Sequence, residues 1–160
     1  MIKVYIEKVR PDAKIPTYAN NFDAGMDICA CEDRDIDINS TCVVPTGLKV
    51  AIPEGYEIQV RPRSGLSLNT RLRITNSPGT IDTGYRGEIG IIIHNSSQAN
   101  EGDLYISEKS NRQGVYHIKK GDRIAQIVLQ QVPRMEFVET DDVTKIGQDR
   151  GGGFGSTGVR

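Results

Sequence analysis

The chain has 160 residues, which is enough for one compact domain and too short for two comfortable ones. Its 20 basic and 21 acidic residues nearly cancel to a net charge of −1, which argues against a dedicated nucleic-acid surface. No segment approaches the roughly 20 apolar residues of a membrane-spanning helix. The first residues alternate as in a strand and lack a signal-peptide core, so we expect a cytoplasmic protein with no membrane partner.

The three cysteines do not predict a disulfide framework or a zinc site. Cys29, Cys31 and Cys42 are odd in number and irregularly spaced, and the two histidines, His94 and His117, show no ligand spacing. We therefore expect the cysteines to be small buried residues.

Short alternating segments predict an all-β fold. Ile2, Val4 and Ile6 alternate with less apolar residues, which predicts a half-buried strand. Further strand-like runs follow between turn residues, at 22–30, 35–39, 42–45, 47–52, 56–61, 89–93, 104–106 and 115–118. A long strand then begins after the turn at 119–122 and ends before Pro133, and 135–138 forms a last short one. This pattern indicates a single β-sandwich or barrel domain spanning 1–160.

Two polar side chains stand out within these strands. Asp27 either points to solvent from an alternating strand or faces a metal or a polar site. Gln126 lies among apolar neighbours, and a half-buried amide needs hydrogen-bond partners. It is therefore either a structural bridge or a ligand contact.

The segment 61–68 interrupts the β pattern. Ser64 is a good N-cap for a short helix, whose free amide N–H groups, with Arg63 beside them, would face an anion. The alternative is a connecting loop whose arginines lie in water.

The segment Gly79–Glu88 is dense in turn-forming residues and precedes an apolar strand. It predicts a tight β-hairpin whose glycines let the backbone approach a ligand closely. Asp82 and Tyr85 are its carboxylate and its aromatic ring. Fixed backbone donors and acceptors suit the edge of a flat heterocycle. The alternative, an ordinary surface turn with a capping Asp, is the commoner role of such a residue.

The polar segment 96–114 is predicted to lie at the surface in contact with water, as either an inserted loop or a hairpin that closes at 115–118. The last segment, 141–160, is poor in apolar residues and rich in glycine, which predicts a mobile C-terminal arm. Phe154 is its one large apolar group and could stack on a ring while Ser156 and glycine amides bind phosphate. The alternative is a frayed terminus.

Taken together, five segments resemble the motifs of the trimeric dUTP diphosphatases, in the order of that family. They are Ala24-Gly-Met-Asp-Ile-Cys-Ala, Pro62-Arg-Ser-Gly-Leu-Ser, Gly79-Thr-Ile-Asp-Thr-Gly-Tyr-Arg-Gly-Glu, Gly121-Asp-Arg-Ile-Ala-Gln and Arg150-Gly-Gly-Gly-Phe-Gly-Ser-Thr-Gly. The resemblance implies a jelly-roll-like β fold and a homotrimer with shared active sites. It also implies Mg²⁺-assisted hydrolysis of dUTP to dUMP and pyrophosphate, which keeps uracil out of DNA and supplies dUMP for thymidylate synthesis.

The resemblance also assigns roles to individual residues. Asp82 would bind the 3′-hydroxyl of the substrate and hold the attacking water as the general base. Gln126, also a catalytic residue, would help to bind the phosphates. Asp27 would bind Mg²⁺ through water. The phosphates of the substrate would be bound by Arg63, Ser64 and Gly65. Uracil would be bound by Asn76, Gly79, Thr80, Ile81 and Gly90, and the sugar would rest on Tyr85. The arm of another subunit would contribute Arg150, Phe154, Gly155 and Ser156.

The chain departs from the family pattern in two places. Arg150 and Phe154 lie one residue closer together than usual, and the segment 96–114 is longer, as an added hairpin or a partner-docking loop would be. The related dCTP deaminases carry a catalytic Glu where this chain has Ile92 and usually Trp where it has Tyr85, which disfavours that activity. A nucleotide-binding protein without catalysis and a purely structural jelly roll are the remaining alternatives.

Overall fold

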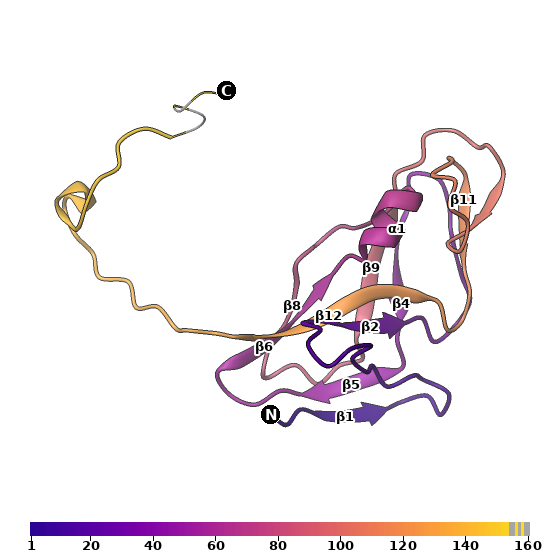
Figure 1. Ribbon diagram of the computed structural model, residues 1–160, viewed down its shortest axis with the longest axis horizontal. Helices are drawn as coiled ribbons and strands as arrows, with labels where there is room; N and C mark the ends of the chain where they lie inside the picture. The colour runs from indigo at the N-terminus through magenta and orange to yellow at the C-terminus, as the bar shows by residue number, and fades with distance from the viewer. Residues whose placement is uncertain (154–155, 157, 159–160) are drawn as a thin grey trace.

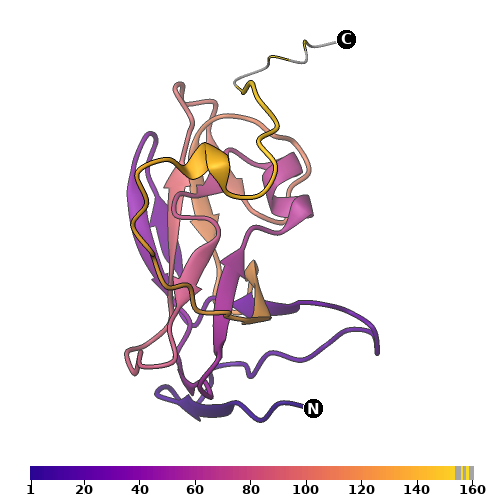
Figure 2. The ribbon, with the colours of Figure 1, turned by 90° about the vertical axis from the view of Figure 1, so that its left-hand side faces the viewer.

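The computed structural model describes residues 1–153, 156 and 158. It is nearly all β, with one short α-helix, as a jelly-roll-like fold requires (Figures 1 and 2). The elements are β1 (Tyr5–Lys8), β2 (Met26–Cys29), β3 (Arg34–Ile36), β4 (Thr41–Pro45), β5 (Leu48–Ala51), β6 (Tyr56–Arg61), α1 (Ser64–Asn69), β7 (Leu72–Ile74), β8 (Gly79–Ile81), β9 (Gly90–Asn95), β10 (Asp103–Tyr105), β11 (Val115–Ile118), β12 (Arg123–Gln131) and the 3₁₀ turn η1 (Val143–Lys145).

The strands form sheets in the orders β2-β12-β6-β8, β4-β9-β7, β10-β11-β3 and β1-β5. Sequence neighbours are seldom paired, so most contacts are long-range. The core between the sheets is mainly aliphatic and includes Ile28, Leu48, Ile91 and Ile93, each of which is fully buried. Because burial alternates along β9, every second residue of that strand faces this core.

Two local predictions are wrong. Gly79–Glu88 is not a β-hairpin, because β8 pairs with β6 whereas β9 pairs with β4 and β7. The segment is a connection between two sheets. The N-cap of α1 is Arg63, without a side-chain cap hydrogen bond, and Ser64 is the first helical residue. The backbone at Arg63 is extended, as is typical of the residue that caps a helix N-terminus.

The two ends of the chain also differ from expectation. All four residues of β1 are exposed, although a half-buried strand was predicted, because this edge strand pairs only with β5. Residues 135–138 form no strand and lie in an arm that extends away from the sheets (Figure 1). Within the described part of this arm, Met135, Phe137 and Val138 are 77%, 90% and 83% exposed. These strand-forming residues pair with no strand among the described residues of their own chain.

The segment 96–114 packs onto the body of the protein. Its strand β10 pairs in parallel with β11, which excludes the predicted hairpin closing at 115–118. Leu104 is fully buried, and the Asn95 side-chain amide donates to the Gly114 carbonyl oxygen at 2.7 Å. The three cysteines are free, with Cys31 buried and Cys29 and Cys42 half-buried. Among the described residues, no helix has the length and apolarity that a bilayer crossing requires.

Candidate active site

The first functional cluster surrounds Asp27 on β2. Its carboxylate accepts hydrogen bonds from Arg63 Nε at 2.8 Å, from Arg123 Nη1 at 3.3 Å and from Gln126 Nε2 at 3.3 Å. Asp27 and Gln126 face each other because β2 and β12 pair in antiparallel register at these two residues. Gln126 is thus at least a structural bridge. Three of the predicted site residues meet here, and Asp27 does not point freely into solvent.

Arg123 is part of this cluster and was not predicted from the sequence. A register shift between Arg123 and Ala125 inserts an irregularity into the β12–β2 pairing. Two adjacent residues, Ile124 and Ala125, are consequently both buried, which breaks the simple alternation. The shift lets Arg123 reach the same carboxylate as Gln126, three residues further on. The only sequence signal was the position of Arg123 inside the Gly121–Gln126 motif.

Arg63 links the cluster to the start of α1. While its Nε donates to Asp27, its Nη1 donates to the Arg123 carbonyl oxygen at 3.2 Å. Ser64 and Gly65 are exposed, and their amide N–H groups have no intrahelical acceptor because they begin the helix. A hollow of about 410 Å³ adjoins the cluster and is lined in part by Lys14, Asp27, Arg123 and Gln126. Cationic groups and open amides in one place suit a phosphate.

A second hollow, of about 220 Å³, lies along β8 and β9. Its lining includes all six residues predicted for uracil and sugar, together with apolar residues: Val60, Asn76, Gly79, Thr80, Ile81, Tyr85, Ile89, Gly90 and Ile92. Two of its glycines have little or no room for a side chain. A Cβ at Gly79 would lie 3.0 Å from Asn76 Nδ2, and a Cβ at Gly90 would lie 2.4 Å from Val43 Cγ1. The size and the mixed polar and apolar wall suit a single planar ring.

Asp82 follows β8 and is exposed at the turn that reverses the chain. The Tyr85 amide donates to the Asp82 carbonyl oxygen at 3.0 Å, which closes this turn. Asp82 lines a third hollow with Tyr56, Glu57 and Arg134. Its carboxylate accepts no hydrogen bond within the described part of the chain and is free to hold water or substrate.

The predicted site residues therefore lie at separate places in one chain. The hollow beside Asp27 and the hollow beside Tyr85 share no lining residue, and Asp82 lines neither of them. Arg150 and Ser156 are exposed, and neither residue lines either hollow. Phe154 and Gly155 lie outside the described residues. One chain alone does not bring the predicted catalytic set together.

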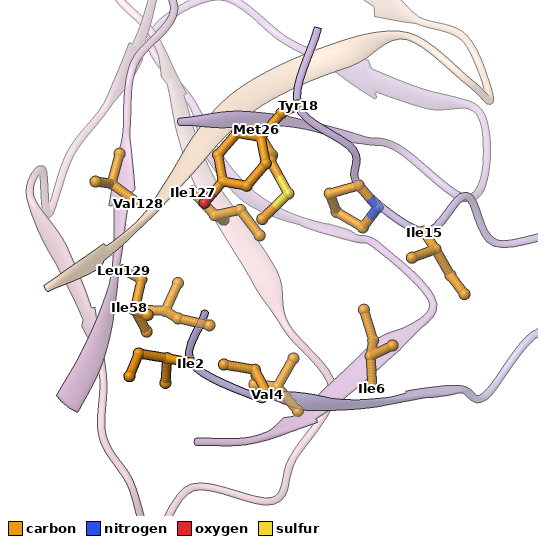
Figure 3. A pocket seen from close by; sticks show the side chains of 12 residues that line it. Ile2, Val4, Ile6, Ile15, Tyr18, Met26, Ile58, Ile127, Val128 and Leu129 are labelled. Atoms are coloured by element: carbon orange, nitrogen blue, oxygen red, sulfur yellow. The ribbon is translucent and has the colours of Figure 1, made fainter. Parts of the chain in front are cut away.

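An apolar groove of about 270 Å³ lies between β1, β5 and β12 and is distinct from these sites (Figure 3). Its lining is mostly aliphatic and includes Ile2, Val4, Ile6, Ile58, Ile127 and Leu129, and Tyr18 contributes a phenol hydroxyl. The alternating residues of the first strand point into this groove, where they remain partly exposed to solvent.

The described residues contain no group of three or more His, Cys, Asp or Glu side chains that could hold a metal ion. Asp23 and Asp27 are the two carboxylates that line the hollow beside the Asp27 cluster. Two guanidinium groups already contact Asp27, and Asp23 accepts a hydrogen bond from the Asn20 amide at 2.8 Å. Such a site does not suit a cation bound by protein side chains alone. It is compatible with Mg²⁺ that arrives on phosphates and keeps most of its water, as Mg²⁺ prefers.

The family model named dUTPase matches residues 11–158. The chain belongs to the dUTPase family. Among curated dUTPases, the deoxyuridine 5'-triphosphate nucleotidohydrolase of Alkaliphilus metalliredigens is 38% identical over 160 residues, with 100% of both chains covered. That of Helicobacter pylori strain P12 is 39% identical over 99% of this chain and 98% of its own.

Solved dUTPase structures support the fold. The dUTPase of Staphylococcus bacteriophage 80alpha with dUPNHPP superposes with a TM-score of 0.87 at 30% identity, covering 98% of this chain and 99% of its own. A mutant dUTPase from phage phi11 of S. aureus, described with a coordinated structural Mg(II) ion, reaches a TM-score of 0.79 at 31% identity over 88% of this chain and 97% of its own.

Proposed function

We propose that this dUTPase hydrolyses dUTP to dUMP and pyrophosphate. The observation that carries the proposal is the glycine-walled hollow beside Tyr85, with Asp82 directly after the strand that forms its wall. The nucleotidohydrolase relatives, and the phage relative solved with dUPNHPP, support the same substrate class.

In this proposal the hollow selects the base and the sugar. Backbone N–H and C=O groups between Asn76 and Gly90 match the hydrogen-bonding edge of uracil, which cytosine reverses in part. We propose that the wall of the hollow also excludes a 5-methyl group on the base. The ring of Tyr85 packs against the deoxyribose and excludes a 2′-hydroxyl.

The cluster at Asp27 takes the triphosphate. Arg63 and the open amides of Ser64 and Gly65 bind phosphate oxygens, and Gln126 orients them from β12. Asp82 accepts a proton from water as the water oxygen bonds to the α-phosphorus. The bond from that phosphorus to the bridging oxygen breaks, and the electron pair leaves with pyrophosphate. A general base of this kind contributes about 10²–10⁴ in rate.

We propose Mg²⁺ as the cofactor, carried on the phosphates, with Asp27 accepting hydrogen bonds from its water ligands. When bound, the ion offsets negative charge on the phosphates and orients them. When Asp27 binds these water ligands, it would release the guanidinium groups of Arg63 and Arg123, which could then bind the substrate.

We further propose a homotrimer in which each site is completed by neighbouring chains. Three observations support this: the predicted site residues are separated in one chain, the apolar arm residues are exposed, and Ile2 and Ile6 in the apolar groove remain partly exposed to solvent. Large apolar patches left in water are uncommon in monomers. The arm residues Arg150, Phe154, Gly155 and Ser156 would close over the substrate of another subunit.

Two finer assignments accompany the proposal. The free cysteines and the nucleotide substrate are compatible with a reducing cytoplasm. A protein-docking role for 96–114 remains a hypothesis, although the packing of Leu104 and Asn95 makes the segment ordered enough to present a surface.

The test is pyrophosphate release from dUTP, dCTP, dTTP and UTP, measured side by side with Mg²⁺. We expect turnover of dUTP far above the other three. Ammonia release from dCTP would favour a deaminase, against which the apolar Ile92 in the wall of the hollow argues. Tight binding without any turnover would favour a non-catalytic nucleotide binder.

A further inference from the structure

Gly87 lies directly beneath the ring of Tyr85. A Cβ built on Gly87 would lie 2.4 Å from Tyr85 Oη, 2.6 Å from Cζ and 3.1 Å from Cε2. The first two separations are shorter than real Cβ atoms show, so the end of the ring occupies the space that any other residue at 87 would fill.

The ring is held in that place by an anchored acceptor. Tyr85 Oη donates to the Glu88 carbonyl oxygen at 2.8 Å, which draws the ring back across Gly87. Glu88 in turn is fixed to the β4–β5 connection, because its Oε1 accepts from the Gly47 amide at 2.7 Å. The next residue, Ile89, donates its amide to the Leu48 carbonyl oxygen at 2.8 Å. Neither the acceptor nor the backbone beneath the ring is free to retreat.

The requirement at position 87 is one of space, not of backbone conformation. Gly87 is not among the glycines with a left-handed φ, so an alanine could adopt its backbone without strain. Gly84 offers a matched comparison in the same turn, because it too lacks a left-handed φ and a Cβ there would meet nothing within 4 Å.

We propose that Gly87 is a positioning residue for sugar selection in this enzyme. Its missing side chain allows the Tyr85 ring to lie flat against the backbone with its hydroxyl on Glu88. A methyl group at position 87 displaces the phenol end of Tyr85 and breaks its hydrogen bond to Glu88. The ring then no longer packs closely against the sugar. This inference rests on the proposed function, in which Tyr85 excludes a 2′-hydroxyl.

The displacement should show as a loss of discrimination and not as a general loss of activity. A ring that has swung outward no longer rejects the extra hydroxyl of UTP, while Asp82 and the phosphate-binding residues are untouched. We expect Gly87→Ala to lower the ratio of kcat/KM for dUTP to kcat/KM for UTP by about tenfold or more, which is the scale at which a pocket distinguishes one small group.

The experiment compares the parent with Gly87→Ala, Gly84→Ala, Tyr85→Ala and the double variant Gly87→Ala/Tyr85→Ala. We expect Gly84→Ala to keep the parent ratio. Because Gly87 acts through the ring, adding Gly87→Ala to Tyr85→Ala should change the ratio no further. A parent-like ratio in Gly87→Ala, or a full additional loss in the double variant, would overturn the proposal.

Two further measurements keep the inference distinguishable from the proposed function. The chain has six tyrosines and no tryptophan, so near-ultraviolet circular dichroism reports tyrosine surroundings directly. Gly87→Ala should alter this spectrum while Gly84→Ala does not, whatever the substrate, and identical spectra would refute the displacement. If Gly87→Ala does not fold, Tyr85→Phe removes only the bond to Glu88 and should still lower the dUTP preference, and an unchanged preference would refute the anchoring. A parent without dUTP turnover would instead refute the proposed function.

Discussion

The replacement Asp82→Asn separates catalysis from folding. Asp82 is exposed, and its carboxylate accepts no hydrogen bond within the described part of the chain, so the isosteric amide removes no contact that stabilises the fold. The free energy of unfolding should change by no more than about 0.5 kcal/mol, as at other exposed positions. The turn itself depends on the Asp82 backbone carbonyl, which the substitution keeps.

Turnover should respond very differently. An amide cannot take a proton from water, so kcat should fall by about 10²–10⁴, which corresponds to about 2.7–5.5 kcal/mol of transition-state stabilisation. Binding of a non-hydrolysable dUTP analogue should stay close to that of the parent. The assay is pyrophosphate release under saturating dUTP, with calorimetric binding of the analogue and urea unfolding as companions. Parent-like turnover in Asp82→Asn would show that the base is another group.

Three further predictions concern the histidine cluster, the 96–114 segment and the arm. The Asp35 carboxylate lies 2.6 Å from His117 Nδ1 and raises the pKa of His117, so this ion pair stabilises the fold fully below the ordinary histidine pKa of about 6.5, and the stabilisation is lost as pH rises through the raised pKa. His117→Asn should therefore unfold at a lower urea concentration than the parent at about pH 6. The difference in urea midpoint should narrow by pH 8–9, about 1.5 to 2.5 units above the ordinary histidine pKa. Tyr116→Phe removes a buried hydroxyl that donates to the Arg112 carbonyl oxygen at 2.7 Å and accepts from the Arg71 amide at 3.1 Å, so urea unfolding should show a loss of about 1–3 kcal/mol. Removal of 150–160 should leave a folded trimer by light scattering with little dUTP turnover, because the described arm contributes few contacts to its own chain.

Each of these three has a contrary outcome. A His117→Asn gap that widened with pH would mean that the neutral ring is the stabilising form, despite the nearby carboxylates of Asp35 and Asp103. For Tyr116→Phe the control is Tyr105→Phe, whose exposed ring should make the change almost neutral, and equal losses would contradict the role of the buried hydroxyl. A truncated chain that was monomeric or unfolded would make the arm structural.

The sequence was most informative where local chemistry decides the structure. Alternation identified the core strands, and the glycines at 79 and 90 indicated a wall that lies close to other atoms, which the contacts with Asn76 and Val43 explain. The residues expected at the base and sugar do line one hollow. Whether they bind uracil remains a prediction.

Non-local choices could not be predicted in the same way. Nothing in Gly79–Glu88 shows that β8 and β9 join different sheets, because strand pairing depends on partners far along the chain. Arg123 was missed because a register shift breaks the alternation that assigns side chains to faces. The exposure of β1 and of residues 135–138 was not predicted, because both segments carry apolar residues of the kind that strands bury. In the proposed trimer these residues are buried by another chain.

The central claim is that each active site combines residues of two chains. One chain supplies the hollow for the pyrimidine and the Asp82 carboxylate, and another chain supplies the cluster at Asp27 that binds the phosphates. This claim is tested most directly by co-expressing Asp82→Asn with Asp27→Asn, two variants that should each be nearly inactive alone, and measuring pyrophosphate release from dUTP by the purified mixed assemblies. If each site takes Asp27 and Asp82 from different subunits, random assortment rebuilds about a quarter of the sites and restores turnover accordingly. Mixed assemblies as inactive as the single variants would place both carboxylates in the site of one chain and contradict the account.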